Sequence, residues 1–313
     1  MVPDSRREEQ PLQVLVVGAG AIGGFYGARL AQAGAQVSVV VRSDFDIIRR
    51  EGFHFDSIDG DFTFRPEAVY GSPVECPTPP DLLIIATKAL PEIDLIGLIR
   101  PVVGENTTLL LIQNGIHIEA PIAEAFPDNT LISGLAFICV NKTAPGRIRH
   151  LCFGRLAIGR YPQGNAPMTE RLARLFESVN VPCSITDDVM EARWRKLVWN
   201  APFNPISVLA GGVTTREMLS TPESISVIRA VMEEVLAIAA ADGYPLEKEL
   251  VQKNIDDTHA MEPYKTSMLL DYESGRTMEV EAILGNALRL ADHYELKAPH
   301  LRTLHALLSL AAR

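Results

Sequence analysis

A glycine pattern near the start of the chain constrains its fold more than any other feature. Three glycines are spaced G-x-G-x-x-G, and they are Gly18, Gly20 and Gly23. An apolar run at residues 14–17 precedes them, helix-forming residues extend over residues 21–33, and a second β-branched run covers residues 37–41. This order of strand, glycine turn, helix and strand predicts a dinucleotide-binding unit.

Each glycine of the turn has a separate physical purpose. We expect Gly18 to allow a tight turn, Gly20 to let the backbone approach a pyrophosphate, and Gly23 to let the helix lie close to the strand. Ala21 and Ile22 then open the helix, whose N-terminus offers N–H groups and partial positive charge to a phosphate. These five residues are the predicted cofactor contacts of the turn. The alternative is a domain of the same shape whose crevice holds no nucleotide.

The end of the second strand indicates which cofactor the domain prefers. NAD-binding domains usually place a carboxylate about twenty residues past the glycines. This chain has Arg42 at the strand tip instead, and Asp44 follows two residues later. A guanidinium suits a 2′-phosphate, so we predict NADP(H). Asp44 weakens this interpretation, and a solvated surface role for Arg42 is the alternative.

Length and charge exclude several classes of protein. A chain of 313 residues suggests two domains. Its 29 basic and 39 acidic residues give a formal charge of −10, which argues against nucleic acid or an anionic membrane as a partner. The four cysteines form no C-x-x-C motif and indicate free thiols in a reducing cytosol.

The chain also lacks the patterns of targeting, membrane and metal-binding segments. Residues 1–11 are polar and have no apolar signal core, and no apolar run reaches the roughly 18 residues that span a bilayer. The seven histidines show no metal-ligand spacing. We therefore expect a cytoplasmic protein without a metal site.

Two further strand ends carry polar side chains. Residues 81–87 read as a buried strand that ends at Lys88, and residues 107–112 read as another that ends at Gln113-Asn114-Gly115. Ligands of doubly wound sheets bind beyond such strand ends. Lys88 and Asn114 are therefore candidate ligand contacts. The alternatives are a solvated lysine and an ordinary Asn-Gly turn.

The hydrophobic pattern divides the chain into two domains. In the N-terminal part, the remaining predicted helices cover residues 45–50, 93–99, 118–126 and 168–178, and the remaining strands cover residues 53–55, 62–64, 130–140, 146–160 and 183–186. From residue 187 onward the periodicity is helical, with helices at residues 225–241, 279–291 and 300–311. We predict a Rossmann-type doubly wound α/β domain over residues 1–186 and an all-helical domain over residues 187–313.

The stretch WRKLVWNAPFNP in the helical domain combines charge, amides and prolines. Lys196 and Asn200 are four residues apart and share one helix face, and Asn204 continues the row. Pro202 and Pro205 are expected to kink or end the helix. This composition favours a site over a packing surface. The alternative is a kinked core helix with an exposed lysine.

A third polar group lies later in the chain. Ser267 and Asp271 can share a helix face, and Glu279 and Glu281 both stand near the start of a helical run. A carboxylate there is favoured by the helix dipole and could be a simple cap. The pattern alone does not choose between the two glutamates.

Taken together, these motifs resemble those of one enzyme family. The glycine turn, Lys88, Gln113-Asn114-Gly115, the Lys196–Asn200–Asn204 row, Ser267-Met268 with Asp271, and Glu279 with Gly285 occur in the order and spacing of the ketopantoate reductases (2-dehydropantoate 2-reductases). The similarity extends over residues 12–308. It implies a Rossmann domain followed by a helical domain like that of 6-phosphogluconate dehydrogenase. The implied reaction is the NADPH-dependent reduction of ketopantoate to (R)-pantoate, in the pathway to pantothenate and coenzyme A.

The resemblance also implies a role for each matched residue. Lys196 would be the general acid, and Glu279 would be its partner carboxylate, in contact with substrate and cofactor. Asn114 would meet both the nicotinamide and the substrate. The implied substrate-positioning residues are Asn200, Asn204 and Ser267, and the implied holders of the cofactor are Arg42 and Lys88.

One position departs from the family pattern. Some members carry another substrate-binding asparagine ten residues after the match to Asn204, where this chain has Thr214. A shorter hydroxyl changes the pocket, so the alternative function is an NADPH-dependent reductase of another branched 2-oxo acid. A catalytically silent NADP(H)-binding sensor is the third interpretation. The apolar helical domain leaves a homodimer open.

Overall fold

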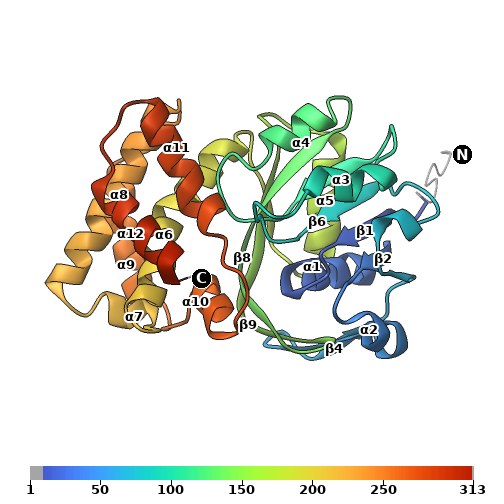
Figure 1. Cartoon of the computed structure of the whole chain (residues 1–313). Helices are drawn as coiled ribbons and strands as arrows, with labels where there is room; N and C mark the ends of the chain where they lie inside the picture. The colour runs from blue at the N-terminus through green and yellow to red at the C-terminus, as the bar shows by residue number, and fades with distance from the viewer. Residues whose placement is uncertain (1–9, 312–313) are drawn as a thin grey trace, which may run out of the picture.

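The protein forms an α/β half and a helical half that lie side by side (Figure 1). The structure is a computed structural model that describes residues 10–311, so most of the predicted polar N-terminal segment lies outside the described residues. The strands are β1 (Gln13–Val17), β2 (Gln36–Val40), β3 (Phe53–Ser57), β4 (Phe62–Phe64), β5 (Val69–Tyr70), β6 (Leu82–Ile85), β7 (Thr108–Leu111), β8 (Leu131–Ala144), β9 (Arg147–Arg160) and β10 (Cys183–Ile185).

Helices complete both halves. Those of the α/β half are α1 (Ala21–Gln32), α2 (Phe45–Glu51), α3 (Leu95–Ile99), α4 (Ala120–Ala125) and α5 (Pro167–Ser178), with 3₁₀ turns η1 (Pro73–Glu75) and η2 (Arg100–Val102). Those of the helical half are α6 (Val189–Leu209), α7 (Thr215–Met218), α8 (Pro222–Ala241), α9 (Glu249–Ala260), α10 (Ser267–Glu273), the π-helical turn η3 (Glu281–Gly285), α11 (Asn286–His293) and α12 (Pro299–Ala311).

One sheet runs through the α/β half. Its strand order is β4-β3-β9-β8-β7-β6-β1-β2-β5, and β10 pairs with β9. Strands β2, β1, β6, β7 and β8 are mutually parallel neighbours, whereas β8 and β9 form a long antiparallel pair. The parallel part brings the ends of β1, β2, β6 and β7 to one edge, as the doubly wound prediction requires. The predicted fold class is confirmed.

Alternating side chains give this sheet two buried faces. Val14 and Val16 of β1 belong to one hydrophobic cluster, which includes residues of α1 and α5. Leu15 and Val17 belong to another, which includes residues of the α3 and α4 regions. Because successive strand residues point to opposite faces, a continuous apolar run is what a strand covered on both faces needs.

The glycine turn after β1 packs as its spacing predicts. Gly18 has φ +89°, and a Cβ there would lie 2.5 Å from the Thr87 backbone nitrogen. A Cβ on Gly23 would lie 2.5 Å from the Gly18 carbonyl oxygen, so only glycine lets α1 lie this close to the turn. α1 then begins at Ala21, directly beyond the turn.

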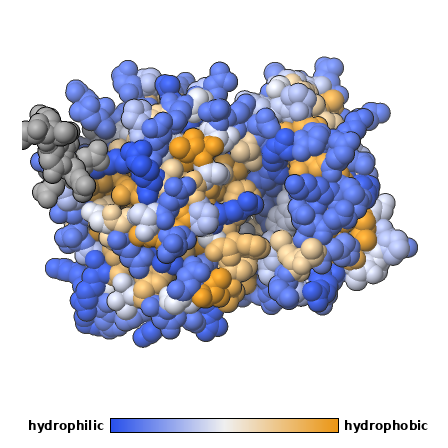
Figure 2. Space-filling view, turned by 180° about the vertical axis from the view of Figure 1, so that it is seen from behind, coloured by the Kyte–Doolittle hydropathy of each residue, from blue (hydrophilic) through white to orange (hydrophobic). Residues whose placement is uncertain are grey.

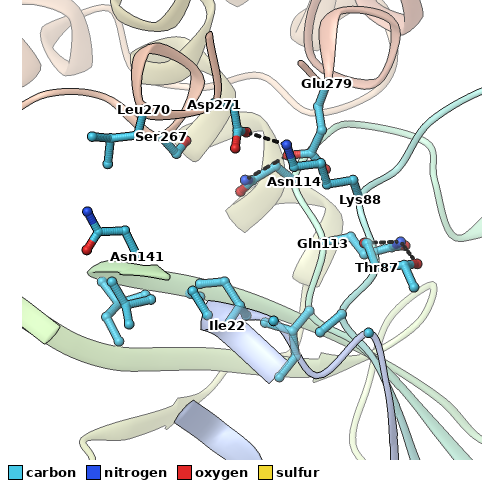
Figure 3. Close-up of a pocket in the computed structure, with 18 of the residues that line it drawn as sticks. Ile22, Thr87, Lys88, Gln113, Asn114, Asn141, Ser267, Leu270, Asp271 and Glu279 are labelled. Carbon is cyan, nitrogen blue, oxygen red and sulfur yellow. Dashed lines mark hydrogen bonds and ion pairs between the residues drawn. The ribbon is translucent and has the colours of Figure 1, made fainter. Parts of the chain in front are cut away.

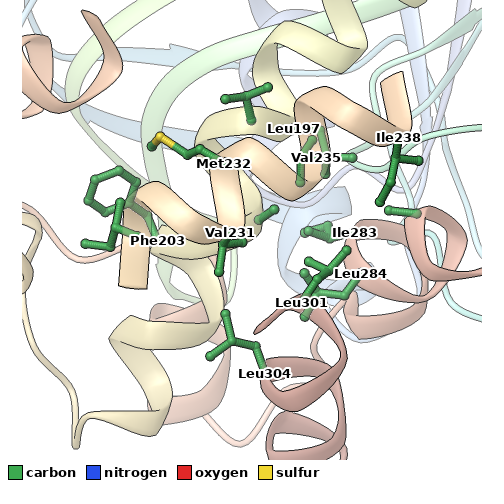
Figure 4. Close-up of a cluster of buried hydrophobic side chains, with 14 of the residues drawn as sticks. Leu197, Phe203, Val231, Met232, Val235, Ile238, Ile283, Leu284, Leu301 and Leu304 are labelled. Carbon is green, nitrogen blue, oxygen red and sulfur yellow. The ribbon is translucent and has the colours of Figure 1, made fainter. Parts of the chain in front are cut away.

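The helical half is organised around α6. Its buried side chains pack with those of α8, α12 and the segment around η3 in one hydrophobic cluster, part of which is shown in Figure 4. Leu197 and Phe203 of α6 belong to this cluster together with Val231 and Met232 of α8. α6 packs against this core and also contacts β8 and β9.

The structure refines the predicted helices of this half. The helix does not end at Pro202 or Pro205, because α6 continues to Leu209 with both prolines inside it. The predicted helix over residues 279–291 is confirmed as an unbroken helical run over residues 280–293, whose first part is the π-helical turn η3 before α11. The short helix α7 and the longer α9 were not predicted. Tertiary packing stabilises such segments despite prolines and weak periodicity.

The junction between the halves lies near the predicted boundary. β10 ends at Ile185 and α6 begins at Val189, although the boundary at residues 186 and 187 stays a prediction.

Seen from behind, the surface is mostly hydrophilic and has a recess between the halves (Figure 2). Among the helices of residues 10–311, none has the length and apolar character required to cross a membrane.

Candidate active site

A cavity of about 1710 Å³ lies where the two halves meet. The loops after β1, β2, β6 and β7 line it from the α/β half, and α6, α9, α10 and the segment before η3 line it from the helical half. The predicted site residues that line it are Gly18, Gly20, Ala21, Ile22, Arg42, Lys88, Asn114, Lys196, Asn200, Asn204, Ser267 and Glu279. Gly23, the remaining predicted cofactor contact of the turn, does not line the cavity, because it lies where α1 packs against Gly18 and Val16.

Asn114 connects the two charged side chains at the centre of the cavity. The Lys196 ammonium donates to Asn114 Oδ1 at 2.9 Å and to the Ala136 carbonyl at 2.8 Å. Asn114 Nδ2 donates to Glu279 Oε2 at 3.4 Å, and the Ala89 N–H donates to Glu279 Oε1 at 3.0 Å. Figure 3 shows Asn114 and Glu279 pointing toward each other. Three segments distant in the sequence thus form one polar chain, Lys196–Asn114–Glu279.

Burial adjusts the protonation of both ends of this chain. The pKa of Lys196 is lowered to about 7, mainly by burial and also by the nearby Arg193 guanidinium, while Glu279 acts in the opposite direction. Burial raises the pKa of Glu279 above its ordinary value, although the bonds from Ala89 and Asn114 act in the other direction. An ammonium with a pKa near neutrality is suited to donate a proton. Lys196 Nζ also lies over the Phe137 ring, 5.3 Å from its centroid, where the negative face of the ring attracts the ammonium.

The two candidate glutamates have different surroundings. Glu279 lines the cavity, whereas Glu281 does not. The Glu281 carboxylate is paired with Arg289 at 2.9 Å and with His305 at 2.7 Å. Residues two apart point to different faces of a helical turn. Only Glu279 is placed to meet a ligand.

Lys88 connects the two halves across the mouth of the cavity. Its ammonium donates to the Thr277 carbonyl at 2.6 Å and forms an ion pair with Asp271 at 2.8 Å. Asp271 also pairs with Arg276 at 2.9 Å. Figure 3 shows the Lys88 and Asp271 side chains meeting, with Ser267 one turn before Asp271 on α10. Lys88 lines the cavity, and its predicted contact with a cofactor stays a prediction.

Arg42 and Asp44 are held very differently at the end of β2. The Arg42 side chain is exposed to the cavity and forms no hydrogen bond or ion pair with any residue between 10 and 311. Asp44 is buried and accepts from the Lys142 ammonium at 2.8 and 2.9 Å and from the Gly146 N–H at 3.1 Å. Burial raises the pKa of Asp44, but the bonds from Lys142, Gly146 and Ser43 outweigh it and hold the pKa below its ordinary value. The carboxylate is therefore engaged within the protein.

Several buried polar atoms of the lining have no partner in the described part of the chain. These atoms are Asn204 Nδ2, Asn254 Nδ2 and Asn141 Oδ1. Asn204 is 2% exposed and Asn200 is 8% exposed, and both face the cavity from α6. Buried polar groups normally find a hydrogen-bond partner. Unpaired amide groups beside a cavity thus fit a polar ligand with several oxygen atoms.

The space around the glycine turn fits a pyrophosphate. A Cβ added to Gly20 would meet no protein atom within 4 Å, so the open space lies on the cavity side of the turn. The N-terminus of α1 begins at the next residue, where its free N–H groups can bind an anion. The residues present therefore fit a dinucleotide.

Thr214 lies apart from this constellation. Its hydroxyl and backbone N–H both donate to Glu217, at 2.6 and 2.7 Å, in a capping box at the start of α7. It is not among the cavity-lining residues. Thr214 therefore caps α7 and does not form part of the cavity lining.

Three residues beside the site were not predicted: Arg193, Lys142 and Asn254. Arg193 precedes Lys196 by three residues, so the periodicity that picked out Lys196 could also have indicated Arg193. No local sequence pattern indicates Lys142 or Asn254, because Lys142 is notable for its contact with Asp44 and Asn254 for its place in the cavity.

Among residues 10–311, no group of three His, Cys, Asp or Glu side chains is arranged to hold a metal ion.

A dinucleotide-binding sheet faces a helical half. Between the two halves, an amide bridges an ammonium and a carboxylate. This arrangement defines a two-domain oxidoreductase. The family model "Ketopantoate reductase PanE/ApbA" matches residues 14–163, and the model "Ketopantoate reductase PanE/ApbA C terminal" matches residues 188–312. The chain belongs to the ketopantoate reductase family.

Individual relatives agree with this assignment. The chain is 34% identical to 2-dehydropantoate 2-reductase of Nostoc sp., and the match covers 93% of this chain and 92% of that protein. It is 48% identical to 2-dehydropantoate 2-reductase from Methylococcus capsulatus, whose crystal structure superposes with a TM-score of 0.90 and 96% of each chain covered. D-mandelate dehydrogenase, at 21% identity over 96% of this chain and 98% of that one, shares the fold with a TM-score of 0.88. Family and fold together support a nicotinamide dinucleotide as the cofactor.

Proposed function

We propose that this chain reduces the ketone of 2-dehydropantoate to the hydroxyl of (R)-pantoate with NADPH, in the pathway to pantothenate and coenzyme A. The observation that carries the proposal is the polar chain Lys196–Asn114–Glu279 in the cavity between the halves. When bound, the reduced nicotinamide supplies a hydride to the ketone carbon. The protein then has to place the ketone, stabilise the charge that develops on its oxygen and supply a proton.

Lys196 is the proton donor in this proposal. Its ammonium lies beside Asn114 in the cavity, and its lowered pKa of about 7 permits proton transfer near neutral pH. As negative charge grows on the ketone oxygen, the ammonium stabilises it and transfers one proton, leaving a neutral amine. Glu279 holds Asn114, and through it the lysine, in a fixed orientation.

The amide-rich face of α6 is the proposed substrate site. Asn200 and Asn204 face the cavity on the same helix row as Lys196, and the unpaired Nδ2 of Asn204 can donate to a substrate oxygen. Ser267 reaches the cavity from the start of α10. These neutral groups can bind a carboxylate and a hydroxyl without adding charge next to Lys196.

NADPH is proposed over NADH because of the contrast between Arg42 and Asp44. Arg42 lines the cavity with its guanidinium unpaired among residues 10–311, while Asp44 is engaged by Lys142. A 2′-phosphate would meet a cation at this strand tip, and a ribose 2′-hydroxyl would lack a carboxylate partner. Lys88 and the N-terminus of α1 complete the proposed cofactor site.

The test is a substrate screen that follows NADPH oxidation. Purified protein is given 2-dehydropantoate and a panel of other branched 2-oxo acids, and pantoate is identified as the product. We expect the highest kcat/KM with 2-dehydropantoate. A higher value with another 2-oxo acid would assign the chain to that substrate instead. NADPH binding without any oxidation would support the sensor alternative and contradict the enzyme. A homodimer remains a separate proposal, checked by the mass of the protein in solution.

A further inference from the structure

A buried ion pair lies directly behind the catalytic side chains. The Arg193 guanidinium on α6 contacts the carboxylate of Glu119, which immediately precedes α4. Arg193 is 3% exposed and Glu119 is 0% exposed. Ser133 of β8 joins the pair, because its hydroxyl donates to Glu119 Oε1 at 2.6 Å and accepts from Arg193 Nε at 2.9 Å. Burying such a pair costs free energy because both charges lose water. A buried ion pair next to the site is therefore a candidate for a functional role.

Arg193 donates hydrogen bonds to the loop that carries Asn114, at the residue before Asn114 and at the residue after it. Its Nη1 donates to the Gln113 carbonyl at 2.9 Å and to the Gly115 carbonyl at 3.1 Å. Asn114 is the residue between these two carbonyls, and its side chain accepts from Lys196. A planar guanidinium can hold two carbonyls at once, which an ammonium on a flexible stem does poorly.

Arg193 and Lys196 are also coupled along one helix. They are three residues apart on α6 and so lie on neighbouring positions of one face. Both line a small cavity of about 10 Å³ together with Asn114 and Asn200. A displacement of Arg193 would therefore move both partners of the Lys196–Asn114 hydrogen bond.

We propose that Arg193 is a positioning residue for the reduction, which holds Asn114 against Lys196, and that Glu119 balances its charge. This inference rests on the proposed function of Lys196 as the proton donor. The loop after β7 and the helix α6 come from different halves of the protein, so the Arg193–Glu119 pair fixes the catalytic contact across their junction. Arg193 itself touches neither substrate nor cofactor in this proposal.

The charges around Lys196 make the proposal testable by pH. Arg193 acts on Lys196 from the same helix and lowers its pKa, while Glu279 acts from the segment before η3 and raises it. β8 presents the Phe137 ring, on whose face the Arg155 guanidinium of β9 also lies. Glu119 faces Arg193 and reduces its influence. Removing Glu119 alone and removing both members of the pair should thus shift the pKa of Lys196 in opposite directions.

The experiment compares three variants with the unaltered full-length protein. Glu119→Gln leaves the Arg193 charge uncompensated and should move the alkaline limb of kcat/KM to lower pH. The double variant Arg193→Met with Glu119→Gln should move it to higher pH, in each case by roughly 1 pH unit. Arg193→Lys keeps the charge but loses the paired hydrogen bonds to the two carbonyls. It should leave the limb in place and lower kcat by roughly tenfold to hundredfold.

A second readout separates this proposal from the proposed function. The lysines are reductively ¹³C-methylated in the protein without added cofactor, and the Lys196 signal is assigned by its loss in Lys196→Arg. Its titration should move in the same two directions, whatever substrate the enzyme uses. As a matched control, the exposed pair Arg302–Asp292 is replaced by Met and Asn and should change neither readout.

The outcomes decide as follows. Opposite shifts of the Lys196 titration, with a lowered kcat in Arg193→Lys, support the positioning role. An unchanged titration in both Glu119→Gln and the double variant overturns it, even if the protein reduces 2-dehydropantoate. Should the double variant fail to unfold cooperatively on heating, Glu119→Gln and Arg193→Lys decide alone. Normal kcat in Arg193→Lys together with an unmoved limb in Glu119→Gln would then reject the proposal.

Discussion

Two cations on opposite walls of the cavity, Arg42 and Lys196, are held in different ways. On the wall proposed to bind the cofactor (the cofactor wall), formed by the ends of β1, β2 and β6, the Arg42 guanidinium is exposed and has no protein partner among residues 10–311. On the wall proposed to carry the catalytic residues (the catalytic wall), formed by α6, α10 and the segment before η3, the Lys196 ammonium is bound to Asn114 and Ala136 and has a lowered pKa. An exposed guanidinium is suited to bind a ligand charge, whereas a desolvated ammonium is suited to give up a proton.

This difference predicts how strongly each wall responds to mutation. An exposed cation contributes binding energy that water and salt weaken. A partly buried proton donor acts in the transition state, where little else can replace it. Changes on the catalytic wall should therefore lower kcat steeply, and changes on the cofactor wall should mainly raise KM for the cofactor.

The largest effect is expected from Lys196→Ala. Because general acid catalysis contributes about 10²–10⁴-fold, kcat for 2-dehydropantoate should fall by that order while NADPH still binds, as measured by its fluorescence. Lys196→Arg should not restore the rate, since guanidinium is a poor proton donor near neutral pH. Lys297→Ala, at an exposed position outside the cavity, is the control. Near-normal turnover by Lys196→Ala would place the proton donor elsewhere.

The pH profile of the unaltered enzyme tests the same residue. Lys196 can donate a proton only below its pKa, so kcat/KM for reduction should be full at acidic pH and decline as pH rises through about 7. A profile that stays flat to pH 9 would contradict the assignment of Lys196 as the acid.

A smaller effect should separate Glu279 from Glu281. Glu279 holds Asn114 by a charge-assisted bond, and such bonds contribute about 1.5–3 kcal/mol. Glu279→Ala should therefore reduce kcat/KM by roughly tenfold to hundredfold, whereas Glu281→Ala should be mild because Glu281 does not line the cavity and is paired with Arg289 and His305. Steady-state kinetics of both variants give the comparison, and equal losses would remove the distinction between the two carboxylates.

On the cofactor wall, Arg42→Ala should act on only one of the two nicotinamide cofactors. Loss of a charge-assisted contact to the 2′-phosphate should raise KM for NADPH by roughly tenfold to hundredfold and leave NADH nearly unchanged. Arg49→Ala, an exposed arginine on α2 outside the lining, is the matched control. Equal losses with both cofactors would remove the phosphate assignment.

The smallest predicted effect concerns Lys142, which keeps Asp44 engaged. Lys142→Ala frees a carboxylate two residues from Arg42, where it can accept from a ribose hydroxyl and repel a phosphate. Partly exposed ion pairs contribute about 0.2–1 kcal/mol, so the ratio of NADPH to NADH kcat/KM should fall by a few-fold. Lys142→Arg retains the pair and should retain the ratio. An unchanged ratio in Lys142→Ala would show that Asp44 takes no part in cofactor choice.

Local patterns in the sequence were enough to select several residues that line the cavity on both walls. The glycine turn is a continuous segment whose backbone conformation depends on Gly18, Gly20 and Gly23 themselves. Arg42 follows from its place at the end of β2, and the row Lys196, Asn200 and Asn204 follows from the helix period. Each of these features depends on residues within one or two elements, which is why sequence could reveal them.

Only the tertiary structure decided how these features meet. Asn114 contacts Lys196 across 82 positions of the chain and Glu279 across 165 positions. Lys142 reaches Asp44 across 98 positions. The choice of Glu279 over Glu281 depends on the backbone around a π-helical turn, which hydrophobic periodicity does not predict. The sequence by itself determined which groups each segment offers, whereas packing of the two halves decided which of them lose water and which come within hydrogen-bonding distance. Those two conditions set their pKa values and their chemistry.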